Sequence, residues 1–184
     1  MATNLTGATN FAKIALSIAY AAEKALDMST PDDKGSLSIK ETLTFGTGNS
    51  ASDMLWHDRR ILAASATDSL DLAGVLTNFT GATVTFAKVH CILVHNRSDE
   101  ALTTAAHGVT HTATAAVLDV GAPANGALIL KVVGDLITLA AGDWVVVFSK
   151  AGKTITAGTG DLFDLVETAA LEAAYDIIVL GESA

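Results

Sequence analysis

The stretch LAASATDSLDLAGVLTNFTGATVTFAKVHCILV, residues 62–94, decides the fold of this chain. Polar and apolar residues alternate over 69–74, which is the pattern of a short, half-buried strand. Asn78 and Gly81 follow, and both residue types tolerate the positive φ angles of tight turns. The first half of the stretch therefore predicts a strand that ends in a turn.

The second half of the stretch predicts one long strand. Alternation returns at residue 82 with β-forming side chains, and it slips by one position near Ala87 and Lys88. Such a slip moves every following side chain to the other face unless a β-bulge absorbs it, so we expect a bulge there. Both faces are apolar over residues 89–94, which indicates a central strand covered on both sides.

The rest of the chain repeats this pattern of short alternating segments separated by Gly, Asn and Asp turns. Further strands are expected at residues 37–45, 54–63, 102–120, 127–133, 136–139, 144–149, 153–156, 162–167 and 175–180. Many short strands are typical of a sandwich or a jelly roll. We predict a mainly β protein: an N-terminal arm and loop at residues 1–36, and an antiparallel, jelly-roll-like β-sandwich at residues 37–184.

The N-terminal arm allows two interpretations. Its alanines and the AAEKAL sequence favour a helix, but its large apolar residues alternate strictly and would share a face only on a strand. We favour a strand over residues 12–20, and a helical turn up to Leu26 stays open. An arm with one apolar face can dock on its own sandwich or be exchanged with a neighbouring copy. The candidate interface residues are Ile14, Leu16, Ile18 and Tyr20.

Four blocks of the sequence resemble a family of small β-sandwich virion structural proteins of tailed bacteriophages. The blocks are LAASATDSLDLAGVL (62–76), GATVTFAKV (81–89), TAGTGDLFDL (156–165) and YDIIVLG (175–181), in that order. The resemblance covers roughly residues 26–181 and is weakest between 101 and 142.

This resemblance implies a non-enzymatic virion protein that is assembled in the cytoplasm of a bacterial host. The favoured role is a head decoration (cement) protein bound to the major capsid protein or to other virion proteins. The alternative is a tail, baseplate or fibre-associated module. Because decoration proteins of tailed phages commonly occupy three-fold positions of the shell, the resemblance also implies a homo-oligomer, with a homotrimer expected.

Composition and charge argue against several other classes of partner. No apolar run reaches the roughly 18 residues of a membrane span, and no secretory signal is evident. The net charge is −9 and no basic stripe occurs, so we expect no nucleic-acid binding. Residues 99–184 hold three basic and eleven acidic residues, which suits a solvated surface or a basic patch on a protein partner. Cys91, the single cysteine, is expected to be a buried core thiol.

Three short motifs suggest chemistry, and none has the context that the chemistry needs. His107 and His111 have the spacing of two metal ligands on a helix, but their neighbours favour strands. Gly46-x-Gly48 is followed by a strand pattern instead of the helix that a dinucleotide site requires. Gly152-Lys153-Thr154 lacks the first glycine of a phosphate loop. We therefore expect no enzyme activity, metal, cofactor or small-molecule substrate.

Overall fold

The computed structural model describes residues 12–23, 32–74, 76–78, 81–104, 109–121 and 136–184, and most of them lie in β-strands. No helix occurs in these ranges. Within the same ranges, no helix is long and apolar enough to cross a membrane. The prediction of a mainly β protein is confirmed, while the strand expected at residues 127–133 lies outside the described residues.

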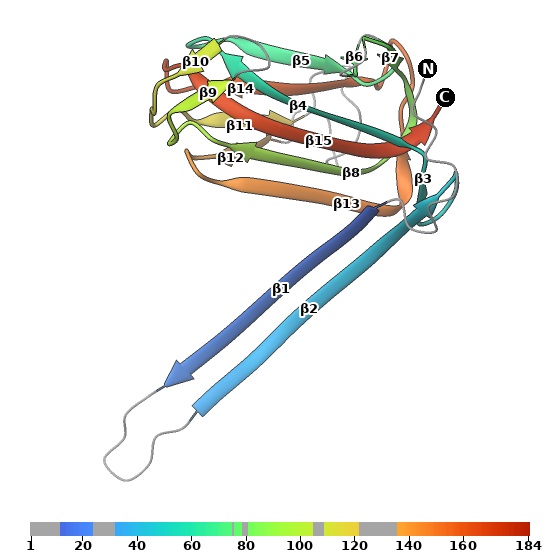
Figure 1. Cartoon of the computed structure of the whole chain (residues 1–184), viewed down its shortest axis with the longest axis horizontal. Helices are drawn as coiled ribbons and strands as arrows, with labels where there is room; N and C mark the ends of the chain where they lie inside the picture. The colour runs from blue at the N-terminus through green and yellow to red at the C-terminus, as the bar shows by residue number, and fades with distance from the viewer. Residues whose placement is uncertain (1–11, 24–31, 75, 79–80, 105–108, 122–135) are drawn as a thin grey trace.

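The body is a sandwich of two four-stranded antiparallel sheets (Figure 1). We call the first the arm-side sheet; its order is β13 (Trp144–Thr154), β8 (Phe86–Asn96), β15 (Ala173–Ser183) and β4 (Met54–Leu62). The far sheet has the order β12 (Leu136–Leu139), β11 (Leu118–Gly121), β14 (Leu162–Glu167) and β5 (Thr67–Asp71). Along the chain, the first, third, sixth and eighth of these strands form the arm-side sheet. This alternation between two sheets is the jelly-roll arrangement.

Shorter strands complete the described part of the chain. β6 (Leu76–Thr77) pairs with β7 (Thr83–Val84), and β9 (Leu102–Thr104) pairs with β10 (Val109–His111). The strands β12 and β14 have the bounds expected from the sequence, residues 136–139 and 162–167. Each is a short run of alternating residues with turn residues on either side, so its ends are easy to place.

The core lies between the two sheets and is built from the inward-facing residues of both. Trp56, Phe86, Phe163 and Ile177 are buried in one continuous cluster. The indole nitrogen of Trp56 donates to the carbonyl oxygen of Thr77 at 3.0 Å, so its polar atom is satisfied. This core gives the body the apolar burial that a domain of this size needs.

The predicted bulge in β8 is confirmed, and a second irregularity follows it. The pairing of β8 with β15 skips Ala87 and also skips His90. The central position of β8 is confirmed as well. The prediction that both faces of this strand are covered holds only in part. On the outer face, Leu43 covers Cys91 from outside the sandwich, while Leu93 is half-buried.

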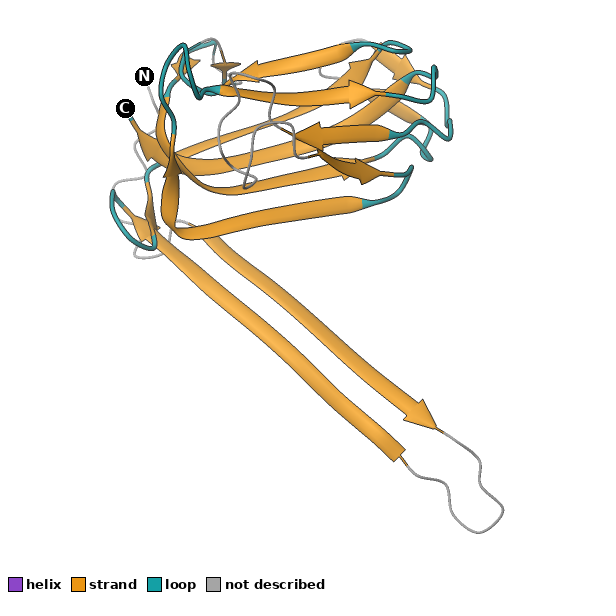
Figure 2. Cartoon of the chain, turned by 180° about the vertical axis from the view of Figure 1, so that it is seen from behind, coloured by secondary structure: helices purple, strands orange, loops and turns teal. Residues whose placement is uncertain are grey.

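The N-terminal segment forms a long ribbon that runs away from the end of the sandwich (Figures 1 and 2). It consists of β1 (Ala12–Glu23) and β2 (Asp32–Phe45), paired antiparallel over the full length of β1. We call this ribbon the hairpin arm. The strand interpretation of residues 12–20 is confirmed, and residues 24–26 lie outside the described ranges. The expected boundary after residue 36 falls inside β2, so the arm extends to Phe45.

Candidate functional site

The hairpin arm has one apolar and one polar row of positions. Ile14, Leu16, Ile18 and Tyr20 pair in register with Glu41, Ile39, Leu37 and Gly35. Because directly paired positions of antiparallel strands share a face, the four predicted interface positions lie on the face that also carries Leu37 and Ile39. The alternate positions form the other face and are mainly polar: Lys13, Ser17, Ser36, Ser38, Lys40 and Thr42.

Ile39 shows how one described residue of the apolar face is placed. Ile39 is 48% exposed, a high value for a large apolar side chain. Within the described residues, β1 pairs only with β2, so its second edge carries no neighbouring strand. A two-stranded ribbon is only marginally stable in water by itself. The arm therefore offers both an apolar face and a free strand edge for contact with another surface.

Leu43 connects the apolar face of the arm to the sandwich. It stands two positions from Glu41 on the same strand face, and it is fully buried at 0% exposure. Its neighbours are Cys91 and Leu180 on the outside of the arm-side sheet, with Val146 and Phe148 packed beside them. Burial also raises the pKa of the Cys91 thiol to about 11, which leaves it an unreactive packing residue.

A tight turn after β2 fixes the base of the arm. Gly46 and Gly48 have φ angles of 133° and 106°, which glycine adopts without steric strain. The chain then forms β3 (Ala51–Ser52), which lies parallel to the end of β2. The Ser52 hydroxyl donates to the carbonyl oxygen of Gly181 at 2.7 Å, and the Ser50 amide donates to the carbonyl oxygen of Lys150 at 3.0 Å. The base of the arm is thus hydrogen-bonded to both β15 and β13.

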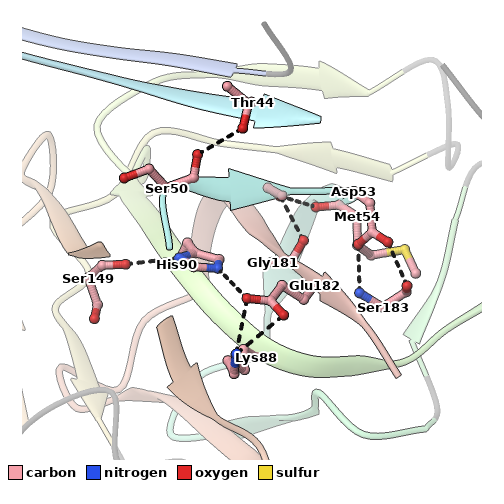
Figure 3. A network of polar contacts seen from close by, with 11 residues as sticks. Thr44, Ser50, Asp53, Met54, Lys88, His90, Ser149, Gly181, Glu182 and Ser183 are labelled. Carbon is pink, nitrogen blue, oxygen red and sulfur yellow. Dashed lines mark hydrogen bonds and ion pairs between the residues drawn. The ribbon is translucent and has the colours of Figure 1, made fainter. Parts of the chain in front are cut away.

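A buried carboxylate, Glu182, gathers the segments that meet at this base (Figure 3). Its Oε1 atom lies 3.0 Å from His90 Nε2 and 3.3 Å from Lys88 Nζ. The other ring nitrogen of His90 lies 3.0 Å from the carbonyl oxygen of Ser149, so both ring nitrogens face oxygen atoms that accept hydrogen bonds. Asp53 adds a nearby clamp, because its carboxylate accepts from the Ser183 amide and hydroxyl, both at 2.7 Å.

The hydrogen bonds to Glu182 outweigh the cost of its burial. Burial alone would raise the pKa of this carboxyl group, but donation from His90, from the Gly48 amide and from Lys88 holds the pKa below its usual value. The Gly48 amide belongs to the turn that follows the arm. An ionised Glu182 therefore ties the base of the arm to the central strand of the sheet.

The other candidate residues from the sequence lie in structural positions where the structure describes them. His111 is buried, with Nδ1 at 2.9 Å from Glu172 Oε1 and Nε2 at 3.2 Å from the Ser98 carbonyl oxygen. Both ring nitrogens are thus engaged in structural contacts, and His107 lies outside the described residues. Over the described ranges, no group of three or more His, Cys, Asp or Glu residues is arranged to hold a metal ion. After Gly46-x-Gly48 the chain forms β3, which was not predicted, and then β4, which begins at residue 54 as the sequence pattern predicts.

Sequence reasoning missed the anchor formed by Leu43, His90 and Glu182. One signal was present: Glu182 is an acidic residue directly after the apolar run YDIIVLG. His90 and Glu182 are 92 residues apart, and only the pairing of β8 with β15 brings them together.

Comparison with models of known protein families, with characterised proteins and with solved structures finds no match for this chain. The structure itself shows how the arm is held. It places an amphipathic ribbon on a firmly hydrogen-bonded base.

Proposed function

We propose that this chain is a non-enzymatic virion structural protein of a tailed bacteriophage, a decoration protein that binds the major capsid protein. The observation that carries the proposal is the anchored hairpin arm, which projects from a jelly-roll body with its apolar residue Ile39 exposed. The sequence resemblance described above supports the same role. Jelly rolls also occur in viral capsid proteins and in lectins, so the fold agrees with the role without selecting it.

The two parts of the molecule suit an architectural role. The body has a complete apolar core of its own, so it does not need a partner in order to fold. Over the described residues the outer arm is a single two-stranded layer, and covering its apolar face with another subunit is favourable. A shell repeats such a contact many times, and symmetry turns individually weak contacts into lasting attachment.

Charge favours a basic surface as the capsid partner. The chain has a net charge of −9, and residues 99–184 carry eleven of its acidic residues. Attraction between this surface and a basic patch on the capsid would be screened by salt. Binding of the purified protein to expanded capsids is therefore expected to weaken as salt is raised from about 50 to 500 mM. Binding that does not change with salt would remove this role from the acidic surface.

The copy number in the virion tests the proposed function. Quantitative mass spectrometry of purified virions, referenced to the major capsid protein, is expected to give hundreds of copies, because head lattice positions are numerous. A few to dozens of copies would indicate the alternative, a tail, baseplate or fibre-associated module. Absence of the chain from the virion would contradict both roles.

The expected oligomer is a homotrimer. The chain mass is 18.8 kDa, and light scattering of the purified protein at micromolar concentration is expected to give three chain masses. A dimer or a larger closed ring would keep the architectural role and correct the symmetry. A monomer in solution that also bound capsids as single copies would contradict the trimer.

A further inference from the structure

The outer face of the arm-side sheet carries a second uncovered apolar surface. Strand pairing brings Leu180 beside Leu55, and Ile178 beside Leu93. Ile177 and Val179 point into the core, so the alternate residue Ile178 lies on the outside, where it is 38% exposed. We define the outer apolar face by six residues: Leu55, Leu93, Trp144, Val146, Phe148 and Ile178.

Three of these six residues are exposed, and the other three are half-buried. Leu55 is 45% exposed and Trp144 is 55% exposed. Single exposed apolar residues are ordinary. Here they share one sheet face with two histidines, since His57 pairs with Ile178 and His95 pairs with Trp144, and a mainly apolar sheet face commonly marks an interaction site. At its far end the surface stops at an ion-pair cluster, where Asp176 lies 2.5 Å from Arg59 and 3.0 Å from Arg97.

The structure shows what kind of residue covers this face. At the end near the arm, Leu43 sits on Cys91 and Leu180 and excludes water from them. Leu43 belongs to the same row of β2 as Leu37 and Ile39, because the three positions differ by even numbers. The arm then runs away from the sandwich (Figure 2). The other apolar positions of the arm therefore do not lie on the outer apolar face of the same chain.

We propose that the apolar face of the hairpin arm lies on the outer apolar face of a second copy of this chain. Each copy holds both halves of the contact, so every arm given to a neighbour can be matched by an arm received. The Leu43 contact within one chain is the beginning of the same packing, continued by a neighbouring arm. This contact is between copies of the chain itself, so it does not depend on the proposed decoration role.

The strands that carry the two surfaces have similar lengths. β1 has 12 residues and β15 has 11, which at about 3.3 Å per residue correspond to lengths of ~40 Å and ~36 Å. A two-stranded ribbon ~40 Å long and ~10 Å wide buries roughly 800 Å² when both contacting surfaces are counted. In a closed ring, each chain gives one arm and receives another, so it takes part in two contacts of roughly 800 Å² each; each is small for a protein interface, and the ring holds its members through the repetition of the contact.

Crosslinking between two singly substituted chains tests this contact. Ile39→Cys on one chain and Ile178→Cys on the other are mixed, allowed to exchange subunits, and treated with a short bismaleimide. Because each chain carries one accessible thiol, every product with two chains is intermolecular. The native thiol of Cys91 is buried, so it contributes little background. The expected result is a strong band at two chain masses in the mixture and a weak one in either variant alone.

Leu136→Cys is the matched control. Leu136 is 54% exposed on β12 of the far sheet, and it replaces Ile178→Cys in an otherwise identical mixture. Equal crosslinking of Ile39→Cys to both sheets would overturn the inference. Crosslinking confined to the Ile39→Cys variant alone would also overturn it, because the arms would then contact each other. Absence of crosslinks in protein that is monomeric by light scattering would overturn it as well. None of these results depends on the copy number in virions, so the two proposals can fail separately.

Discussion

The hairpin arm and the body are both built from strands in which polar and apolar residues alternate. Over the described residues, only the body buries its apolar residues in a core between two sheets. In the body, inward residues such as Trp56 and Phe163 are 1% and 2% exposed between two sheets. In the arm, apolar positions are gathered on one face just as regularly, but Ile39 is 48% exposed. The same alternation builds a sandwich when two layers meet and leaves an apolar residue exposed when one layer stands alone. This contrast is why we propose the arm, and not the body, as the part that contacts a partner.

The largest expected effect is a difference in the free energy of unfolding between a core variant and an arm variant. Phe163→Ala removes a buried ring from the core and is expected to lower the free energy of unfolding by about 3–5 kcal/mol. Ile39→Ala in the arm is expected to change the free energy of unfolding of the separate, monomeric chain by less than about 0.5 kcal/mol, because the residue is exposed within one chain. Urea unfolding of the two variants, followed by tryptophan fluorescence, measures both values. Similar losses in the two variants would place the arm inside the cooperative unit of the body.

The anchor is expected to give an intermediate effect. Glu182→Gln removes the negative charge of the carboxylate that His90 and Lys88 contact. It is expected to lower the free energy of unfolding by about 2 kcal/mol. Asp99→Asn is the matched control, since it removes one negative charge from an exposed turn. Thermal melting of both variants checks the prediction. If Glu182→Gln melted like the control, the buried network would not be what fixes the base of the arm.

Acid is expected to weaken the anchor by a smaller amount. The folded-state pKa of Glu182 lies below its usual value, so its stabilising contribution is complete above the unfolded pKa near 4.5 and is lost as pH falls below it. Asp176 behaves in the same way: burial would raise its pKa, but hydrogen bonds from Arg59 and Arg97 lower it. Urea midpoints between about pH 7 and pH 3 should fall in the native protein and fall less steeply in Glu182→Gln. Identical slopes in both proteins would assign the acid sensitivity to other carboxyl groups.

Alternation in the sequence was sufficient for most strands and for the jelly-roll class, because one buried face imposes period two on each strand. The pattern predicted that β2 begins at residue 37, but the strand begins at Asp32. Residues 32–36 are polar or glycine and have low strand propensity, and their pairing with β1 makes them a strand. The pattern also placed Ile14, Leu16, Ile18 and Tyr20 on one face of a strand, as the register has them. Their role as an interface stays a prediction.

The anchor could not be predicted because it depends on which strands become neighbours. Lys88 and His90 belong to the segment whose alternation slips, and the slip indicated a bulge but not its purpose. Glu182 meets them only through the pairing of the last strand with a central one. The outer apolar face has the same origin, since residues of β4, β8, β13 and β15 form one surface only after the sheet is assembled.

One variant tests the central claim, that the arm joins copies while the body folds without it. Ala15 pairs with Lys40 in the arm, so residues 16–39 can be replaced by Asn-Gly, a two-residue hairpin turn that connects these paired positions. Leu43, Glu182 and the whole base of the arm are kept. The account predicts a melting temperature of the monomeric body within about 2 °C of that of the native protein, together with loss of the oligomer in light scattering. A shortened protein that keeps the native oligomer, or one that no longer folds, would contradict it.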